Sequence, residues 1–249
     1  MKYLSMLGTI VGISLSISSV AQAGEIVKYQ VNGLDYEGYY TSPAEGAPMV
    51  LLVHDWDGLT DYEMKRAEML AEMGYSVFAA DLFGAGIRPT EVTDKKQHTG
   101  ELYKDREKMR SLLEGAMSKA KQLGGNTDNS VAMGYCFGGA AVLEMARSGA
   151  PLKGFATFHG GLNTPEGQDY SKTQGSILVM HGSADSAITM DQFANLANEL
   201  ESTKVKHEMI TYSGAPHAFT VFGSERYRED ADTKSWDRFS NYLAATLNN

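Results

Sequence analysis

The only cysteine of this chain lies in a setting suited to nucleophilic chemistry. Among 249 residues, Cys136 is flanked by glycines in the run Gly134-Tyr135-Cys136-Phe137-Gly138-Gly139. A buried strand is predicted to end at Tyr135 and a helix to start near Gly138, so small residues surround a sharp turn that lifts the central side chain clear of the backbone. The helix start also favours a thiolate. The pattern G-x-C-x-G therefore predicts a nucleophile elbow that carries sulfur where serine is usual.

Other interpretations of Cys136 compete with the elbow. A free cysteine is most often a small buried apolar side chain. A glycine-rich turn can instead hold a phosphate, although the glycine spacing here does not match the dinucleotide-binding fingerprint. A redox sensor is a further alternative, but the chain has no second cysteine that could resolve a sulfenic acid. We therefore favour the elbow.

A candidate acid and a candidate base follow the cysteine, each just after a predicted strand. Asp185 ends the run His181-Gly182-Ser183-Ala184-Asp185, and His217 ends the run Gly214-Ala215-Pro216-His217. The order nucleophile, acid, base, with room for one strand–helix unit between successive members, is that of α/β-hydrolases. Taken singly, Asp185 could cap the following helix and His217 could be a turn residue. Their coincidence at strand ends predicts a catalytic triad with Cys136.

The loop after an earlier strand is predicted to complete the site. In this architecture that loop donates one backbone N–H to the oxyanion hole, and the residue after the nucleophile donates the other. The run His54-Asp55-Trp56-Asp57-Gly58 occupies this place. The N–H groups of Trp56 and Phe137 are therefore the predicted donors.

Composition and charge exclude several other classes of protein. A net charge of −9 lacks the basic surface that nucleic acids demand. One cysteine can form neither an intramolecular disulfide nor a cysteine-rich zinc site. His54, His159 and His181 could suggest a metal, yet no two of them stand at i, i+4 on a predicted helix. We therefore expect no metal and no cofactor, and a small molecule as the partner. The sequence does not indicate an oligomeric state.

Strand-like and helix-like runs alternate along the chain and would position these residues. The hairpin turn signal Asn32-Gly33 joins two strands, and Thr60 with Glu63 forms a capping box before a helix that stops at Gly74. The predicted strands cover 26–32, 34–41, 49–54, 76–81, 130–135, 154–158, 176–181 and 205–212. The predicted helices cover 61–73, 138–148, 190–202 and 233–247, with a further helical face from Met109 to Ala120.

This alternation predicts an α/β-hydrolase fold, a mostly parallel sheet with helices on both faces. Residues 24–249 contain no linker, low-complexity tract or repeat, which indicates a single domain. The least regular stretch, Phe83 to Lys104, is predicted to be a loop or a partial lid. Ligands bind beyond the carboxyl ends of parallel strands, where the candidate residues lie.

Residues 1–23 are predicted to be a signal peptide that is removed on export. Lys2 precedes an uncharged run from Leu4 to Val20, and Ala21-Gln22-Ala23 fits the small-x-small cleavage pattern. A membrane anchor is the alternative, since the apolar run is nearly long enough to span a bilayer. The cleavage triplet favours export, so the mature protein is expected to be periplasmic or secreted, without stable membrane anchoring.

At these residues the chain resembles the dienelactone hydrolase family, which is named for carboxymethylenebutenolidase. The resemblance runs from about Val31 to Leu247. It rests on Leu51-Leu52-Val53-His54-Asp55-Trp56-Asp57-Gly58, Ala80-Asp81-Leu82-Phe83-Gly84, the cysteine elbow, Phe158-His159-Gly160-Gly161 and His217-Ala218-Phe219. It implies a triad of Cys136, Asp185 and His217, and an acid on the first loop that communicates with the thiol. That acid is Asp55 here, where the best-known members carry glutamate.

The resemblance also implies a way of holding the substrate, from which this sequence departs. The best-known members bind a substrate carboxylate with two arginines. The corresponding places here are the run after His217 and a position near Thr99, and neither holds arginine. Arg88 and Arg106 are the candidates to replace them. The acyl pocket is expected to have aromatic walls, with Trp56, Phe83, Phe158 and Phe219 as candidates.

The predicted chemistry is hydrolysis through an acyl-cysteine. A thiolate is a good leaving group, so the alcohol must leave well for the reaction to proceed. We therefore expect activated esters, enol-lactones of the dienelactone type or thioesters as substrates. The alternative from another class is a non-catalytic small-molecule-binding protein on the same scaffold.

Overall fold

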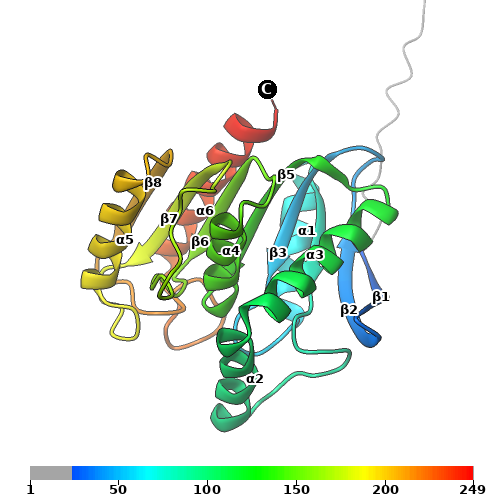
Figure 1. The fold of residues 1–249 in the computed structure, drawn as a ribbon, viewed down its shortest axis with the longest axis horizontal. Coiled ribbons are helices and arrows are strands. Elements are labelled where there is room, and N and C mark those ends of the chain that lie inside the picture. Colours follow the sequence, from blue (N-terminus) through cyan, green and yellow to red (C-terminus); the bar gives the residue numbers. More distant parts are fainter. Residues whose placement is uncertain (1–23, 249) are drawn as a thin grey trace, which may run out of the picture.

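Eight strands form one sheet in the order β1-β2-β4-β3-β5-β6-β7-β8 (Figure 1). The computed structural model describes residues 24–248, so the predicted signal peptide, residues 1–23, lies outside the described residues. The strands are β1 (Glu25–Val31), β2 (Leu34–Thr41), β3 (Pro48–Val53), β4 (Ser76–Ala80), β5 (Asn126–Tyr135), β6 (Gly154–Phe158), β7 (Ser176–Gly182) and β8 (His207–Tyr212). This arrangement confirms the predicted α/β-hydrolase fold.

The sheet combines an antiparallel edge with a parallel body. β1 and β2 form a hairpin, and β2 also pairs antiparallel with β4. The turn between β1 and β2 holds Asn32 at φ 51° and Gly33 at φ 77°, and these left-handed conformations match the twist of the two strands. From β4 through β3, β5, β6 and β7 to β8 every pairing is parallel. The carboxyl ends of these strands therefore meet at one edge.

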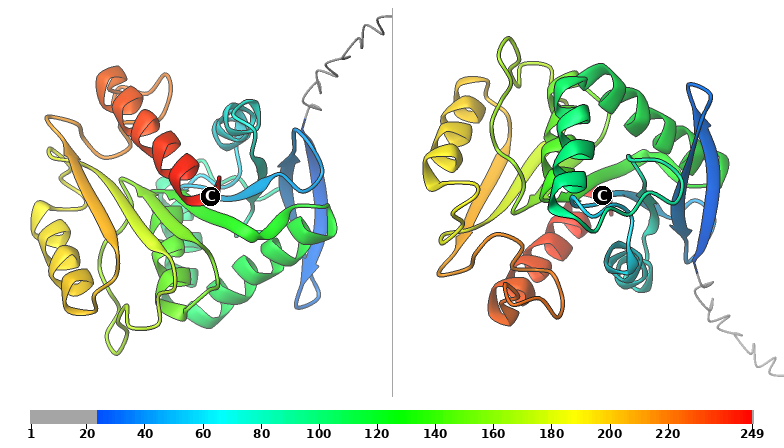
Figure 2. Two further views of the ribbon diagram at one scale, coloured as in Figure 1. Left: turned by 90° about the horizontal axis from the view of Figure 1, so that it is seen from above. Right: turned by 90° about the horizontal axis from the view of Figure 1, so that it is seen from below.

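Helices cover both faces of the sheet, as the views along it show (Figure 2). They are α1 (Asp61–Glu72), α2 (Val92–Lys104), α3 (Arg106–Gln122), α4 (Phe137–Ser148), α5 (Met190–Ser202) and α6 (Glu229–Leu247). Apolar residues of α3, α4 and α5 pack in one core, whereas those of α1 and α6 pack in the other. β3 alternates between the two cores, because Leu51 faces the first and Leu52 the second. The predicted capping box of Thr60 and Glu63 begins α1.

One expectation was wrong in part. The prediction for residues 83–104 is a loop or a partial lid over one end of the sheet, but 92–104 form helix α2 and not a loop, and this helix lies beyond one end of the sheet (Figure 1). Only Thr99 and Leu102 of this helix are buried, so its sequence has almost no apolar periodicity. Two predicted helix starts also differ, since α4 begins at Phe137 and α6 at Glu229.

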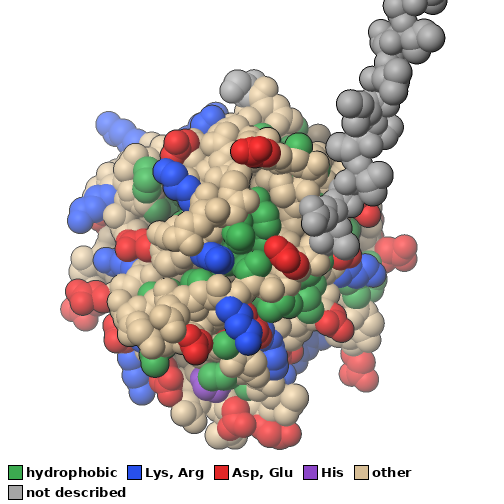
Figure 3. Space-filling view, turned by 90° about the vertical axis from the view of Figure 1, so that its right-hand side faces the viewer, with side chains coloured by type: hydrophobic (Ala, Val, Ile, Leu, Met, Phe, Trp, Pro, Cys, Tyr) green, Lys and Arg blue, Asp and Glu red, His purple; other side chains and the backbone are tan. Residues whose placement is uncertain are grey.

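The face on the β1–β2 side mixes charges of both signs with a group of apolar side chains (Figure 3). Ile26 and Leu34 are large apolar residues of this hairpin that remain exposed, by 47% and 58%. Within residues 24–248, no helix is both long enough and apolar enough to cross a membrane.

Candidate active site

The elbow places Cys136 between the end of β5 and the start of α4. Its backbone has φ 50° and ψ −110°, a left-handed conformation that is rare outside glycine. The turn is tight because its neighbours lack side chains. A Cβ on Gly134 would lie 2.2 Å from the carbonyl carbon of Gly138, and one on Gly138 would lie 2.2 Å from the carbonyl oxygen of Val53. The glycine pattern is therefore required by close backbone contacts.

Cys136, His217 and Asp185 lie in one hydrogen-bonded line. His217 Nε2 is 3.1 Å from Cys136 Sγ, and His217 Nδ1 is 2.8 Å from Asp185 Oδ2. The cysteine follows β5, the aspartate follows β7 and the histidine follows β8, so the parallel strand ends bring distant residues together. This geometry can transfer a proton between sulfur and imidazole, with the carboxylate holding the ring in place.

The acid and the base of this line have shifted pKa values. Burial alone would raise the pKa of Asp185, but hydrogen bonds from His217 and from the N–H groups of Ile188 and Ala187 hold it below its usual range. Burial alone would lower the pKa of His217. The hydrogen bonds to Asp185 and Cys136 outweigh burial and raise this pKa to about 10. The imidazole therefore holds its proton at neutral pH, which is the state that stabilises a facing thiolate.

The predicted oxyanion donors flank this line at two strand ends. Phe137 is the first residue of α4, and Trp56 lies in the turn after β3. In the part of the chain that the structure describes, neither backbone N–H has a hydrogen-bond acceptor. Unpaired N–H groups near a nucleophile can bind a developing oxyanion.

Asp55 is buried beside the oxyanion loop and has a second carboxyl near it. Its residue is 8% exposed, and its Oδ1 accepts the N–H of Asp57 at 2.8 Å. Burial and the charge of Asp57 raise the pKa of Asp55 to about 6. Glu63 of α1 is fully buried, and burial together with the charge of Asp55 raises its pKa to about 8. At neutral pH Glu63 therefore retains its proton, whereas Asp55 is mostly ionised.

Three further histidines are buried at the ends of β3, β6 and β7. His54 Nδ1 is 2.6 Å from the carbonyl oxygen of Asp55, His159 Nε2 is 2.8 Å from Thr220 Oγ1, and His181 Nε2 is 3.0 Å from the carbonyl oxygen of Ile188. His54 therefore contacts the loop of Trp56, His159 the loop of His217, and His181 the loop of Asp185. Among residues 24–248 no cluster of histidine, cysteine, aspartate and glutamate could hold a metal ion.

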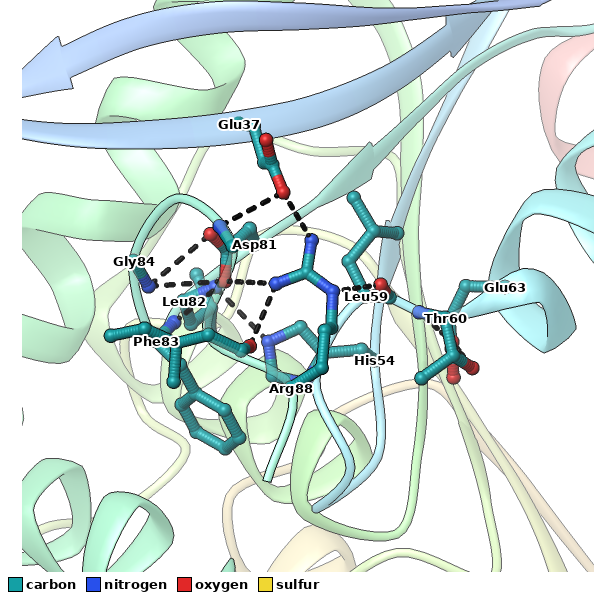
Figure 4. A network of polar contacts seen from close by, with 12 residues as sticks. Glu37, His54, Leu59, Thr60, Glu63, Asp81, Leu82, Phe83, Gly84 and Arg88 are labelled. Carbon is teal, nitrogen blue, oxygen red and sulfur yellow. Dashed lines mark hydrogen bonds and ion pairs between the residues drawn. The ribbon is translucent and has the colours of Figure 1, made fainter. Parts of the chain in front are cut away.

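The candidate substrate-binding residues have other contacts. The Arg88 guanidinium donates to the carbonyl oxygens of Leu59 and Ile87 and pairs with Glu37 and Asp81, so its donors are occupied (Figure 4). Arg106 pairs with Glu144 and donates to the carbonyl of Tyr103. The donors of Arg88 are therefore engaged within the protein. Glu144 also pairs with Arg110 and Arg147 at shorter distances, so it does not neutralise Arg106 alone, and Arg106 stays a candidate for binding an anionic substrate.

Phe219 does not line an open pocket. Its side chain is fully buried in the core that α1 and α6 share, against Tyr212 and the ring of His159. Because Phe219 is close to His217 in the sequence, it is predicted to form part of the wall of the acyl pocket. The chain turns after His217, with Ala218 at φ 61°, and the next side chain is buried in the core.

Helix α2 brings two residues to the site that sequence reasoning missed. The ring of Tyr103 packs 5.5 Å from that of Phe137, and burial together with the charge of Cys136 raises the pKa of its hydroxyl. Lys95 pairs with Asp57 at 2.5 Å and lies over the ring of Trp56. Only the recognition of α2 as a helix, with these residues eight apart, could have placed both on the site.

The sheet order and the position of the candidate site at the carboxyl ends of its strands define an α/β-hydrolase. Comparison with known proteins narrows this class. The model of the dienelactone hydrolase family matches residues 36–247, and the chain belongs to this family. It is therefore a hydrolase of ester or lactone substrates, as the sequence predicts.

Individual relatives agree with this assignment. A Salmonella typhimurium protein named "Putative carboxymethylenebutenolidase" is 24% identical over 245 residues, which cover 93% of this chain and 87% of the relative. The crystal structure of a dienelactone hydrolase-like promiscuous phosphotriesterase from metagenomic libraries is 28% identical, with a TM-score of 0.84, and covers 92% of this chain and 100% of that one. A dienelactone hydrolase-type structure from Klebsiella pneumoniae has a TM-score of 0.79 at 21% identity, covers 90% of this chain and 99% of that one, and supports the fold.

Proposed function

We propose that this protein hydrolyses activated esters, enol-lactones or thioesters through an acyl-cysteine formed on Cys136. The observation that carries the proposal is the hydrogen-bonded line from Cys136 Sγ through His217 to Asp185, with distances of 3.1 and 2.8 Å. A binding protein would have no use for this alignment. The free N–H groups of Trp56 and Phe137 support the proposal, because an acyl transfer needs donors for its oxyanion.

The proposed reaction has two halves. The thiolate attacks the carbonyl carbon, and the oxyanion forms hydrogen bonds with the N–H groups of Trp56 and Phe137, each contributing roughly 3 kcal/mol. The carbon–oxygen bond then breaks, and His217 supplies a proton to the departing alcohol. In the second half His217 takes a proton from water, the hydroxide attacks the thioester, and the carbon–sulfur bond breaks. The products are the acid and the free thiol.

The leaving group determines which substrates are productive. In the tetrahedral intermediate the thiolate and the alkoxide compete to leave, and a thiolate leaves more readily than a simple alkoxide. Enolates, phenolates and thiolates leave well enough to compete. Turnover is therefore expected to follow leaving-group quality more steeply than in a serine hydrolase.

The proposal is tested with a substrate panel on the purified protein. The panel holds p-nitrophenyl acetate, vinyl acetate as an enol ester, an acyl thioester and ethyl acetate, and an aryl phosphotriester is added because a relative is named for that activity. We expect turnover of the first three to exceed that of ethyl acetate by at least about tenfold, and Cys136→Ala and His217→Ala to lose at least about a thousandfold in kcat/KM.

A matched control separates loss of the base from loss of any histidine. His207 lies at the start of β8, away from the carboxyl ends of the strands, so His207→Ala is expected to retain activity. Equal turnover of ethyl and vinyl acetate would contradict the acyl-cysteine route. Activity that survives Cys136→Ala would exclude Cys136 as the nucleophile. Absence of turnover of every substrate in the panel by the wild-type protein would favour a scaffold that binds small molecules without this chemistry.

We also propose that the protein acts outside the cytoplasm, after removal of residues 1–23. The support is the uncharged run and the Ala21-Gln22-Ala23 triplet. The protein used in the panel, when expressed with its full sequence, is then expected to start at Gly24. Recovery of chains that retain Met1 or Lys2 would contradict export with cleavage.

A further inference from the structure

His54 is buried at the carboxyl end of β3 and has a defined partner on each ring nitrogen. It is 0% exposed, so both ring nitrogens need partners within the protein. The backbone N–H of Leu82 donates to Nε2 at 3.0 Å (Figure 4). Nδ1 lies 2.6 Å from the carbonyl oxygen of Asp55. The ring therefore links the turn after β4 to the loop after β3.

These two contacts determine where the ring carries its proton. A backbone N–H can only donate, so Nε2 must be the unprotonated nitrogen that accepts from Leu82. A carbonyl oxygen can only accept, so Nδ1 must carry the hydrogen that Asp55 receives. Burial lowers the pKa of His54 to about 4, which keeps the ring neutral in this tautomer.

The carbonyl that His54 holds belongs to the peptide unit of the predicted oxyanion donor. The carbonyl of Asp55 and the N–H of Trp56 are the two ends of one planar group, and no peptide bond among the described residues is cis. In a trans peptide the oxygen and the hydrogen point in opposite directions. Fixing the oxygen with the imidazole therefore fixes the direction of the Trp56 N–H.

We propose that His54 is a positioning residue that orients the Asp55–Trp56 peptide, so that the Trp56 N–H faces the oxyanion formed at Cys136. This inference rests on the proposed function, since the N–H has a catalytic use only if an oxyanion forms. The benefit is preorganisation, because a donor held in place before the reaction needs no reorientation when charge develops.

The surroundings make His54 a rigid support. Its ring packs against Phe83 at 4.6 Å and against Phe137 at 5.9 Å, and Phe137 carries the other candidate donor. The turn that supplies the Leu82 N–H is itself fixed by Asp81, which accepts the N–H groups of Phe83 and Gly84. Because these rings and the Leu82 N–H fix the imidazole of His54, the imidazole can in turn fix the Asp55–Trp56 peptide.

Substitution of His54 by asparagine or by glutamine separates its hydrogen bond to Asp55 from its hydrogen bond to Leu82. The amide nitrogen of asparagine reaches the place of Nδ1, so His54→Asn keeps a donor for Asp55 and loses the acceptor for Leu82. The amide of glutamine reaches the place of Nε2, so His54→Gln keeps the acceptor for Leu82 and loses the donor for Asp55. Each variant loses one buried hydrogen bond, so their melting temperatures should be similar, which makes them matched controls for stability.

The test compares ester turnover with alkylation of the same thiol. Acylation by p-nitrophenyl acetate forms an oxyanion, whereas alkylation of Cys136 by iodoacetamide displaces iodide and forms none. We expect His54→Gln to lose about 10- to 100-fold in kcat and His54→Asn less than about fivefold. The alkylation rate of both variants should stay within about twofold of wild type, because the Cys136–His217–Asp185 line is untouched.

The outcomes separate this inference from the proposed function. Equal kcat losses in the two variants, or alkylation that falls together with turnover, would overturn the role of His54 and leave the acyl-cysteine route in place. A wild-type protein that alkylates normally but turns over no ester in the panel would remove the proposed function, and the role of His54 with it.

A measurement on the wild-type protein does not depend on folding of the variants. Nitrogen NMR of protein labelled with ¹⁵N-histidine distinguishes the two neutral tautomers. We expect His54 to carry hydrogen on Nδ1 and to stay neutral from pH 6 to 9. Hydrogen on Nε2, or a charged ring in this range, would overturn the inference.

Discussion

Histidines at this end of the sheet differ in charge because their partners differ. His217 faces a carboxylate and a sulfur, which together overcome burial and raise its pKa to about 10. His54 faces a carbonyl and an N–H, which cannot stabilise a second proton, so burial lowers its pKa to about 4. His159 has a hydroxyl partner, and burial and the charge of His217 lower its pKa as well. The order of residues along the sequence predicts His217 as the base, but the charge states of these histidines follow from partners that the sequence does not show.

The carboxyl pair behind the oxyanion loop has a similar dependence on its neighbours. Glu63 Oε2 accepts the N–H and the hydroxyl of Thr60, but its Oε1 is buried with no hydrogen-bond partner among the described residues. The negative charge of Asp55 disfavours the ionised form of Glu63 and so raises the pKa of Glu63. The sequence predicts Glu63 as a helix cap, and the capping box is confirmed. Its second property, a proton retained near neutral pH, follows from burial that the sequence does not show.

This retained proton predicts how stability changes with pH in Glu63→Gln. The folded protein raises the pKa of Glu63 from 4.5 to about 8, so the folded state binds more protons than the unfolded state between these values. The contribution of Glu63 is therefore present below pH 4.5 and lost as pH rises through 8. Glutamine keeps the capping box without titrating. From pH 5 to 8 the free energy of unfolding should shift in favour of the variant by more than about 1 kcal/mol.

Urea unfolding at several pH values measures this shift. Glu72, at the exposed end of the same helix, provides the control, since Glu72→Gln should follow the wild type at every pH. A difference between Glu63→Gln and wild type that stays constant from pH 5 to 8 would show that Glu63 is already ionised in the folded protein.

At the scale of elements, the elbow depends on how closely α4 approaches β3. Gly138 of α4 lies against the last backbone groups of that strand, where an added Cβ would be 2.2 Å from the oxygen of Val53 and 2.5 Å from that of His54. Both neighbours are backbone, which cannot rotate away as a side chain could. This contact places the start of α4, and with it Cys136 and the Phe137 N–H, against the loop that carries Trp56.

Gly138→Ala should therefore impair catalysis more than a helix-favouring substitution normally would. The methyl group must push α4 from β3, which separates the two candidate oxyanion donors. We expect a loss of at least about tenfold in kcat for p-nitrophenyl acetate and a destabilisation of about 1–3 kcal/mol. Steady-state kinetics and thermal unfolding measure the two effects.

Gly100 in α2 is the matched control for this substitution. It is also helical, but a Cβ there meets nothing within 4 Å. Gly100→Ala is expected to keep its activity and to gain up to about 1 kcal/mol in stability, because alanine favours helix. If Gly138→Ala behaved like this control, α4 would not need its close approach to β3.

Sequence patterns predicted those elements whose signals are local. The turn at Asn32-Gly33, the cap at Thr60 and the glycines around Cys136 each require a particular backbone conformation, and all lie where expected. Helix α2 was missed because it buries only two residues and so has no apolar face to detect. The partners of Arg88 were also beyond prediction, since Glu37 and Leu59 reach it from other elements.

At the scale of the whole molecule, a buried ion pair connects α1, α6 and the loop of His217. The guanidinium of Arg66 pairs with Asp232 and donates to the carbonyl oxygen of Thr220 at 3.0 Å. The side chains of Arg66 and Asp232 are only 1% and 7% exposed. Thr220 also bonds through its hydroxyl to Tyr62 and His159. The loop that carries the base is therefore held directly by α1 and by His159 after β6, and α6 supports it through the pairing of Asp232 with Arg66.

Removing one partner of this ion pair should lower the free energy of unfolding more than removing both partners does. Arg66→Met leaves Asp232 buried without its partner, so we expect it to lower the free energy of unfolding by about 3–5 kcal/mol. The double variant Arg66→Met with Asp232→Asn should lose less, because no uncompensated charge remains. Urea unfolding of the single and double variants measures both values.

An exposed ion pair on the same helix gives the comparison. Lys234 and Asp230 are four residues apart on α6, with side chains 63% and 80% exposed. Lys234→Met is expected to change the free energy of unfolding by less than about 0.5 kcal/mol. A double variant as unstable as Arg66→Met alone would indicate that the arginine matters through its packing against Trp236 and Phe222.

The contact between Arg66 and Thr220 joins residues 154 positions apart, and the thiol lies 81 positions before its base. Contacts that close such long loops form late in folding, after the local hairpin and helices. During synthesis Cys136 emerges well before His217 exists, so the newly made chain carries an ordinary thiol. Reactivity arises only when the last strand and its loop dock onto α1. The order of the chain therefore separates the synthesis of the thiol from the assembly of the site that uses it.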